Sequence, residues 1–380
     1  MELGEVLLSI GEAELLAPVS DLFGARVSQL VDTTSTPLSW IGMRPSERAL
    51  SRWQGSALVA GVKRSWSLIL KIQRRVPESD DPDRWDYWRR EFLAYESGLL
   101  DHLPGVTAPG CHGAVERGED ALLWLDDVPE ATPGTWRTER YVRAAHDLGV
   151  FNGAFLAGRP VPQRSWLTRT YLRSWTTWLP WSELARSEAT WSLPIVARAF
   201  PRPPGDRLTR LYRDTPKLLE RLEHLRQTFS HLDCWRANLI GQRLPDGTER
   251  TVLIDWSFTG AAPAGQDLAI LVAGSHVWLD ADPAELTVLS DGALAAYISG
   301  MREIGWRGDE RDVRFGYAAS SALYGAPLVP WWLPRLADPA RREWLEAKCR
   351  RPAEEVAAGW ALLLEHLLKL ADEAEQLLPA

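Results

Sequence analysis

The chain has 380 residues, 45% of them hydrophobic, and a formal net charge of −8, as expected of an acidic globular protein with room for two compact units. The acidic balance argues against nucleic acid as the main partner, because phosphate backbones call for basic patches. The start lacks the basic residues of a signal peptide and no apolar run reaches membrane-helix length, so we expect a cytoplasmic protein with no membrane partner. Three widely spaced cysteines argue against a disulfide framework and a zinc site.

The N-terminal part is predicted to contain strands. Residues 25–31 and 49–53 carry the apolar and β-branched residues typical of strands, and the hydroxyl-rich segment 33–37 lies between them. Residues 66–72 form a further strand-like run that includes Lys71. A lysine ammonium is a compact point charge that binds phosphate groups, so Lys71 is a candidate ligand for nucleotide phosphates.

A helix is predicted over residues 82–100, because apolar residues recur there at intervals of three and four. Its apolar stripe consists of Trp88, Phe92, Tyr95 and Leu99. Glu91 borders this stripe. The pattern allows two interpretations of Glu91: a solvated residue beside two arginines, or a carboxylate that reaches back to Lys71.

The next strand is predicted at residues 121–125 and ends at Asp126 and Asp127, with a proline shortly after them. We expect the border between two units there, with residues 1–125 in the first and residues 126–380 in the second.

The second unit is predicted to be mainly helical. Residues 141–155 have an apolar helical face, in which Gly149 and Gly153 allow close packing. Residues 158–229 are biased towards helix and hold several of the 20 tryptophans in the chain, most of which we expect to be packing residues. Residues 356–377 carry a coiled-coil-like seam that favours packing within the chain over a dimer contact, so both a monomer and a homodimer stay open.

The segment 231–255 is the most informative. Asn238 precedes an apolar strand, residues 244–248 carry a Pro-Asp-Gly turn signature, and a β-branched strand returns to Asp255. An antiparallel hairpin sets Asn238 and Asp255 nearly opposite each other at its open end. Their oxygen atoms then face one point, and such hard ligands suit Mg²⁺ that is bound to nucleotide phosphates.

Asp233 lies just upstream on the same loop. A carboxylate there can orient an incoming hydroxyl and accept its proton during phosphoryl transfer. A single Asp before a strand is usually a turn or cap residue. The joint pattern of Asp233, Asn238 and Asp255 around one hairpin favours a phosphotransferase site instead.

These motifs resemble those of the aminoglycoside phosphotransferase family within the protein-kinase-like fold, whose relatives include choline kinases and maltokinase-like enzymes. The resemblance covers nearly the whole chain. It implies an α+β, protein-kinase-like bilobal fold with a small N-terminal antiparallel-sheet lobe and a larger, mainly helical C-terminal lobe. Two positions depart from the pattern: Leu232 stands where the family often has Gly, and Trp256-Ser257 replaces the Phe-Gly of protein kinases.

The resemblance also implies roles for residues of the predicted hairpin and its loop. Asp233 is the implied catalytic base, and His231 braces its loop. Asn238 and Asp255 are the implied metal ligands. Asp267 is the implied structural aspartate that ties this loop to the following helix.

In the first unit, the resemblance implies an ion pair between Lys71 and Glu91 that holds the lysine at the phosphates. The nucleotide base is implied to contact the backbone of the segment Leu125, Asp126, Asp127 and Val128. The turn over the phosphates has two candidates, of which the first contains Ser35 and Thr36 and the second is the segment 54–56.

The implied activity is Mg²⁺-dependent transfer of the γ-phosphate of ATP or GTP to a hydroxyl of a small molecule. An antibiotic, either an aminoglycoside or another hydroxylated natural product, is the first acceptor class, and a sugar or amino alcohol is the second. The acidic balance is compatible with a cationic acceptor, and some tryptophans of the 158–229 region are expected to border the acceptor.

Two alternatives belong to other classes. A pseudokinase that only binds nucleotide or a partner protein is disfavoured, because Lys71 and the polar residues of the hairpin are all present. A protein kinase is disfavoured because the short distance between Asp255 and Asp267 leaves little room for a long activation loop.

Overall fold

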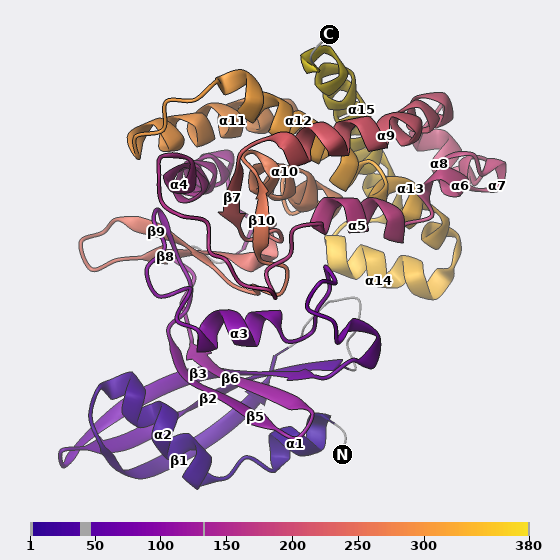
Figure 1. Ribbon diagram of the computed structural model, residues 1–380. Coiled ribbons are helices and arrows are strands. Elements are labelled where there is room, and N and C mark those ends of the chain that lie inside the picture. Colours follow the sequence, from indigo (N-terminus) through magenta and orange to yellow (C-terminus); the bar gives the residue numbers. More distant parts are fainter. Residues whose placement is uncertain (1–2, 39–46, 132–133, 379–380) are drawn as a thin grey trace.

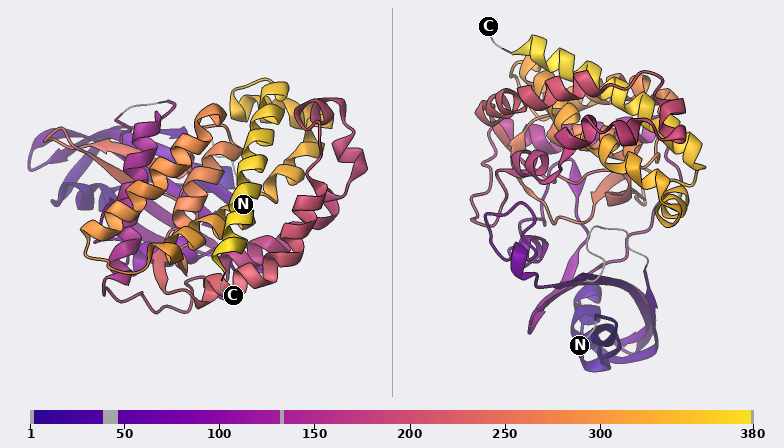
Figure 2. Two further views of the ribbon diagram at one scale, coloured as in Figure 1. Left: turned by 90° about the horizontal axis from the view of Figure 1, so that it is seen from above. Right: turned by 90° about the vertical axis from the view of Figure 1, so that its right-hand side faces the viewer.

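The computed structural model describes residues 3–38, 47–131 and 134–378. A five-stranded sheet and the helices that pack against it form a small lobe from the N-terminal part, and a larger, mostly helical lobe follows (Figure 1). Figure 2 shows the same two lobes from two further directions. The predicted α+β bilobal architecture is confirmed.

The sheet of the small lobe is antiparallel throughout and has the order β1-β2-β3-β6-β5. Its strands are β1 Val27–Pro37, β2 Arg48–Val59, β3 Val62–Arg74, β5 Cys111–Arg117 and β6 Asp120–Asp126. Ala60 and Gly61, with φ values of 48° and 79°, make the tight turn between β2 and β3. The sheet therefore holds Lys71 in the interior of a long strand.

The two faces of this sheet contribute to different hydrophobic cores. Leu68, Leu70 and Ile72 alternate on β3 and pack with the helices α1 Leu3–Leu8 and α2 Glu12–Phe23 in a small core of their own. Leu123 and Leu125, on the other face, belong to the core of the large lobe. Because opposed residues in an antiparallel pair share a face, Lys71, paired with Leu123, lies on the side that meets the large lobe.

The predicted phosphate turn at residues 33–37 is wrong, because this segment is the end of strand β1. Ser35 is paired with Trp53 and Thr36 with Arg52. Threonine is β-branched and fits a strand well, so a run of hydroxyls was no sufficient reason to expect a turn. The second candidate, residues 54–56, lies inside β2. The β1–β2 connection runs through residues 39–46, which lie outside the described residues.

The helix predicted over residues 82–100 is also shorter than expected, since α3 extends only over Arg90–Glu96. The preceding residues form the 3₁₀ helix Pro77–Ser79 and a series of turns. The buried guanidinium of Arg90 accounts for the late start, because it donates to the carbonyl oxygens of Arg84 at 2.5 Å and Trp85 at 2.7 Å. Those carbonyls are thereby turned towards a side chain and away from a helical ladder.

After α3 the chain crosses to the large lobe and back. The short strand β4 Val106–Thr107 pairs in parallel with β9 Glu249–Leu253, which forms an antiparallel hairpin with β8 Leu239–Arg243. Asp246 caps the turn by accepting from the Thr248 N–H at 2.9 Å. The hairpin predicted around the Pro-Asp-Gly turn is confirmed.

The rest of the large lobe consists of helices and one two-stranded sheet, in which β7 Gln227–Ser230 pairs with β10 Gly260–Pro263. The α-helices are α4 Thr138–Leu156, α5 Tyr171–Trp178, α6 Trp181–Ala185, α7 Glu188–Trp191, α8 Pro194–Ala199, α9 Gly205–His224, α10 Gln266–Val277, α11 Leu286–Glu303, α12 Glu310–Gly325, α13 Leu328–Trp332, α14 Pro339–Cys349 and α15 Ala353–Leu377. The 3₁₀ helices are Arg236–Asn238, Pro283–Glu285 and Leu333–Ala337.

Helix α10 is the centre of this lobe, because every one of its residues is buried. Helix α4 packs closely against α11, where a Cβ at Gly149 would lie 2.0 Å from the carbonyl oxygen of Tyr297. The apolar seam of α15 is buried in the same core, including Val356, Trp360 and Leu363. This seam is thus used within the chain. Among the described helices, none is long and apolar enough to cross a membrane.

Candidate active site

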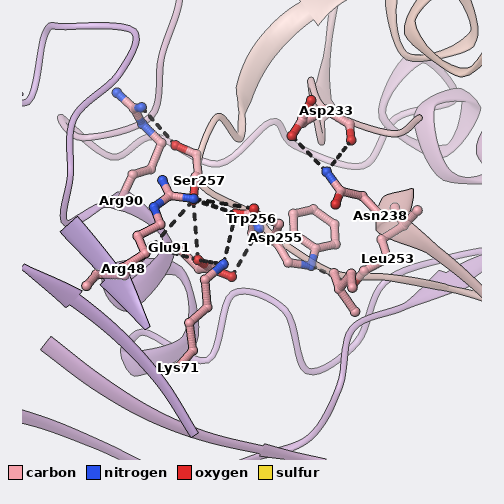
Figure 3. Close-up of polar contacts among 12 residues, drawn as sticks. Arg48, Lys71, Arg90, Glu91, Asp233, Asn238, Leu253, Asp255, Trp256 and Ser257 are labelled. Atoms are coloured by element: carbon pink, nitrogen blue, oxygen red, sulfur yellow. Dashed lines mark hydrogen bonds and ion pairs between the residues drawn. The ribbon is translucent and has the colours of Figure 1, made fainter. Parts of the chain in front are cut away.

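The loop 231–238 and the end of β9 bring three of the predicted polar residues together, Asp233, Asn238 and Asp255 (Figure 3). The Asn238 amide donates to the carboxylate of Asp233 at 2.7 Å and to its backbone oxygen at 2.9 Å. The N–H of Ile254 donates to the Asn238 carbonyl at 3.0 Å, which extends the hairpin by one step and sets Asp255 beside Asn238. Burial raises the pKa of the Asp233 carboxyl well above its ordinary value, and the charge of Asp255 adds to this effect.

Asp267, at the start of α10, holds this loop in place. Its carboxylate accepts from the backbone N–H groups of His231 at 3.1 Å and Leu232 at 2.8 Å, and from the side chain of Asn152 at 3.1 Å. Leu232 has a φ of 67°, a left-handed conformation that glycine adopts without strain. The departure from glycine at this position therefore changes the residue but keeps the turn.

His231 is a neutral bracing residue in this geometry. Its Nδ1 accepts from the N–H of Asp233 at 3.2 Å, so its Nε2 carries the proton and donates to the Ile254 carbonyl at 3.0 Å. Burial lowers the pKa of His231 to about 4. The ring also lies edge-on to Trp256 at a centroid distance of 4.5 Å. His231 thus connects the loop to the strand that leads to Asp255.

Lys71 reaches both lobes. Its Nζ lies 2.5 Å from Glu91 and 2.9 Å from Asp255. Glu91 is 1% exposed and also accepts from Gln73 at 2.8 Å and from the backbone N–H of Trp256 at 3.3 Å. Of the two interpretations that the sequence left open for Glu91, the structure shows the one in which this carboxylate reaches back to the lysine.

Arg48 is a site residue that the sequence analysis missed. One guanidinium nitrogen lies 3.4 Å from both carboxylate oxygens of Asp255. Burial opposes ionisation of Asp255, but Lys71 and Arg48 outweigh burial and bring its pKa well below the ordinary value. The strand register explains why Arg48 reaches the site. Arg48 and Leu50 share a face of β2, and Leu50 is paired with Lys71.

Residues 68–306 match the family model described as the phosphotransferase enzyme family. The chain belongs to this family. The resemblance inferred from the sequence is thereby confirmed, and the protein is an enzyme, an ATP-dependent kinase of small molecules.

Solved structures with similarity to this phosphotransferase include three kinases. An aminoglycoside phosphotransferase from Alicyclobacillus acidocaldarius is 14% identical with a TM-score of 0.47, over 92% of this chain and 93% of that chain. The ethanolamine kinase of Plasmodium vivax is 10% identical with a TM-score of 0.46, over 85% and 83% of the two chains. An amicoumacin kinase in complex with AMP-PNP and Ca²⁺ is 14% identical with a TM-score of 0.46, over 93% and 95%. No curated protein matches the chain.

Strand β6 of the phosphotransferase ends at Asp126, where the segment between the two lobes begins. The carboxylate of Asp126 accepts from the N–H of Gly110 at 2.9 Å and contacts His112 at 2.8 Å. Asp127 forms a bidentate ion pair with Arg52 at 2.7 and 3.0 Å and accepts from Ser67 at 2.6 Å. Both acidic side chains therefore fasten this segment to the small lobe.

Leu125 and Val128, the apolar residues on either side of Asp126 and Asp127, differ in their burial. Leu125 is 6% exposed and belongs to the core of the large lobe, whereas Val128 follows the strand in an irregular, half-buried segment.

Arg90 is a second residue that the sequence analysis missed. It is fully buried, and burial lowers its pKa to about 10. Besides the carbonyls before α3, it donates to the carbonyl oxygens of Trp166 at 2.6 Å and Ser257 at 3.1 Å. It therefore fixes the residues after Asp255 against the helix that carries Glu91. An arginine in a helical pattern gives no sequence signal for such a role, because most are solvated.

Proposed function

We propose that this phosphotransferase moves the γ-phosphate of ATP or GTP to a hydroxyl of a small hydroxylated molecule, with an antibiotic as the first class of acceptor to test. A metabolic sugar or amino alcohol is the second class. The observation that carries the chemistry is the meeting of Asp233, Asn238 and Asp255 with Lys71 at one place. The acceptor class rests on the family resemblance alone.

The donor set fits Mg²⁺ held together with nucleotide phosphates. The Asn238 amide nitrogen is turned to Asp233, which leaves its oxygen for another partner, and Asp255 offers a carboxylate kept ionised by two cations. Mg²⁺ in such sites takes one or two protein ligands and otherwise phosphate oxygens and water. When bound, the ion would neutralise charge that develops on the transferred phosphate.

Lys71 and Arg48 are the proposed phosphate ligands. Lys71 is positioned by Glu91, which is itself fixed by the backbone N–H of Trp256. Arg48 lies close to residues 39–46 in sequence and directs one guanidinium nitrogen to both carboxylate oxygens of Asp255, and a guanidinium is also a good donor to phosphate oxygens. Both cations contact Asp255 in the structure, so both have the reach to contact phosphates that bind beside that carboxylate.

Asp233 is the proposed general base. It lies on the side of Asn238 away from the lysine, and Asn238 orients one of its oxygens. A carboxylate whose pKa is raised by burial holds a proton more readily than a solvated one, which suits the acceptance of a hydroxyl proton. The backbone N–H of Asp233 is held by His231, which limits the freedom of the loop.

The experiment that tests this proposal measures nucleotide consumption with Mg²⁺ across aminoglycosides, nucleoside antibiotics, sugars and amino alcohols, with mass spectrometry for the added phosphate. Asp233→Asn should lower turnover by about 10²- to 10⁴-fold while nucleotide affinity is kept. Asp214→Asn, on the surface helix α9, is the matched control and should retain full turnover. Equal turnover in Asp233→Asn would remove Asp233 from this role, and nucleotide binding without turnover on any acceptor would favour the pseudokinase.

A further inference from the structure

A group of tryptophans continues from the loop of Asp233 across the large lobe. Trp235 follows Asp233 by two residues, and its ring lies 6.0 Å from that of Trp278 at the end of α10. Trp278 contacts Trp332 of α13 at 5.2 Å and Trp344 of α14 at 6.1 Å. Helix α14 lies on the side of the large lobe nearest the small lobe (Figures 1 and 2). The rings therefore extend across the large lobe from the loop that also carries the proposed base.

Two cations lie over these rings. Lys348 Nζ is 4.8 Å from the ring centroid of Trp235 and 5.4 Å from that of Trp278. The guanidinium of Arg335 is 5.1 Å from the ring centroid of Trp332. We call Trp235, Trp278, Trp332, Trp344, Lys348 and Arg335 the tryptophan–cation surface.

Neither cation of this surface forms an ion pair with a carboxylate of the described residues. Asp280 lies near Lys348 electrostatically, but its carboxylate is paired with Arg350 at 3.2 Å. Arg335 donates to the backbone oxygen of Trp331 only. Burial lowers the pKa of both cations, and the neighbouring Arg341 lowers that of Arg335 further. Positive charge without an acidic partner in an apolar setting has a free-energy cost that an anionic ligand would remove.

The indole rings of this surface pack against one another but are partly exposed to solvent. Trp344 is 38% exposed and stacks on Trp332 with an interplanar angle of 20° and a centroid distance of 5.8 Å. Trp235, Trp278 and Trp332 are half-buried. A packing role alone would favour burial of such large rings, whereas the exposed ring of Trp344 offers a flat face to a planar ligand.

We propose that the tryptophan–cation surface is part of the acceptor site and selects a hydroxylated molecule that carries a flat apolar ring and an anionic group, such as a carboxylate. This inference rests on the proposed function, because Trp235 connects the surface to Asp233. The ring of the acceptor stacks on the indoles, and its anion pairs with Lys348 or Arg335. The same two cations repel a polycation. Aminoglycosides are polycations, so they are disfavoured as acceptors under this proposal.

The test compares two probes that share a phenyl ring and a hydroxyl but differ in charge: 3-phenyllactate, which is anionic, and phenylalaninol, which is cationic. Calorimetry measures both affinities for the full-length protein with AMP-PNP and Mg²⁺ present. We expect 3-phenyllactate to bind about 10-fold more tightly. Lys348→Gln and Arg335→Gln should reduce this preference, Lys348→Arg should keep it, and Lys369→Gln, an exposed lysine of α15, should leave it unchanged.

Equal affinities, no measurable binding of either probe, or a preference that survives both charge-removing variants would overturn the proposal. Binding of AMP-PNP is measured in a separate titration of the same protein without the probes. Its loss in the wild-type protein would count against the proposed kinase function, whereas retained nucleotide binding without discrimination between the probes would count against the acceptor class alone.

Discussion

The backbone N–H of Leu232 lies 2.8 Å from the Asp267 carboxylate while Leu232 itself has a φ of 67°. The same carboxylate also accepts from the preceding N–H, that of His231, at 3.1 Å, so two consecutive backbone groups of the loop are held by one side chain. The side chain of Leu232 is nevertheless fully buried in the core of the large lobe. One residue therefore combines a strained backbone with a favourable burial.

A pair of substitutions separates these two contributions. Leu232→Ala and Leu232→Gly both remove the buried side chain, which should cost about 2–4 kcal/mol of unfolding free energy. Only glycine also relieves the positive φ, so Leu232→Gly should be about 1 kcal/mol more stable than Leu232→Ala. Urea unfolding of the two variants measures the difference, and a less stable glycine variant would contradict the assignment of strain.

Removal of Arg48 should weaken the binding of nucleotides, and the loss of affinity should be larger for nucleotides with more phosphates. Arg48→Met is expected to raise the Kd of ATP about 10-fold and to leave that of AMP nearly unchanged, because we propose that the guanidinium contacts the terminal phosphates. Arg64→Met, whose side chain stacks on Phe23, is the control. Titration with ATP, ADP and AMP measures all three affinities. A loss shared equally by ATP and AMP would assign Arg48 a structural role.

The effects of removing Lys71 and of removing Glu91 on the unfolding free energy are expected to be strongly coupled. Lys71 is 4% exposed and Glu91 is 1% exposed, so removal of Lys71 leaves Glu91 buried without its cation and should cost about 3–5 kcal/mol, whereas removal of Glu91 leaves Lys71 paired with Asp255 and should cost less. Lys71→Met combined with Glu91→Leu should cost less than the sum of the single changes. Unfolding of the four proteins in urea gives the coupling energy, and additive effects would show that the two charges act independently.

His112 should make the stability of the protein depend on pH. Its ring lies 2.9 Å from Asp21 of α2 and 2.8 Å from Asp126 of β6. Burial opposes its charge, but the two carboxylates outweigh burial and raise the pKa of His112 above the ordinary value of about 6.5.

Because this pKa is raised on folding, the stabilisation is fully present below about pH 6.5 and is lost as the pH rises through the value in the folded protein. His112→Gln should therefore lower the unfolding free energy more at about pH 5.5 than at about pH 9. Urea midpoints of both proteins across this range test the expectation, and a constant difference would refute it.

The parts of the fold that the sequence predicted well were those fixed by local chemistry. The Pro-Asp-Gly turn and its β-branched flanks determined the hairpin, and the apolar period determined the helices α4 and α15. The sequence motifs also selected Asp233, Asn238 and Asp255, which the structure brings together.

The errors came from residues whose contacts the sequence pattern does not indicate. The late start of α3 follows from carbonyl groups that turn to the Arg90 guanidinium, and no local pattern contains that information. Arg48 contacts Asp255 across the whole site, so its position became evident only from the strand register. The hydroxyl-rich residues 33–37 fit a strand and a turn equally by composition, and pairing with β2 decided between them.

The carboxylate of Glu91 is held in place by several groups before any substrate binds. Its carboxylate is held by Lys71, Gln73 and the backbone of Trp256, and Arg90, next to it in sequence, grips the backbone at Ser257. The conformational entropy of these groups is lost when the chain folds, not when nucleotide binds. The lysine–glutamate pair is thus already formed before nucleotide binds, and binding need not bear the entropy cost of ordering it.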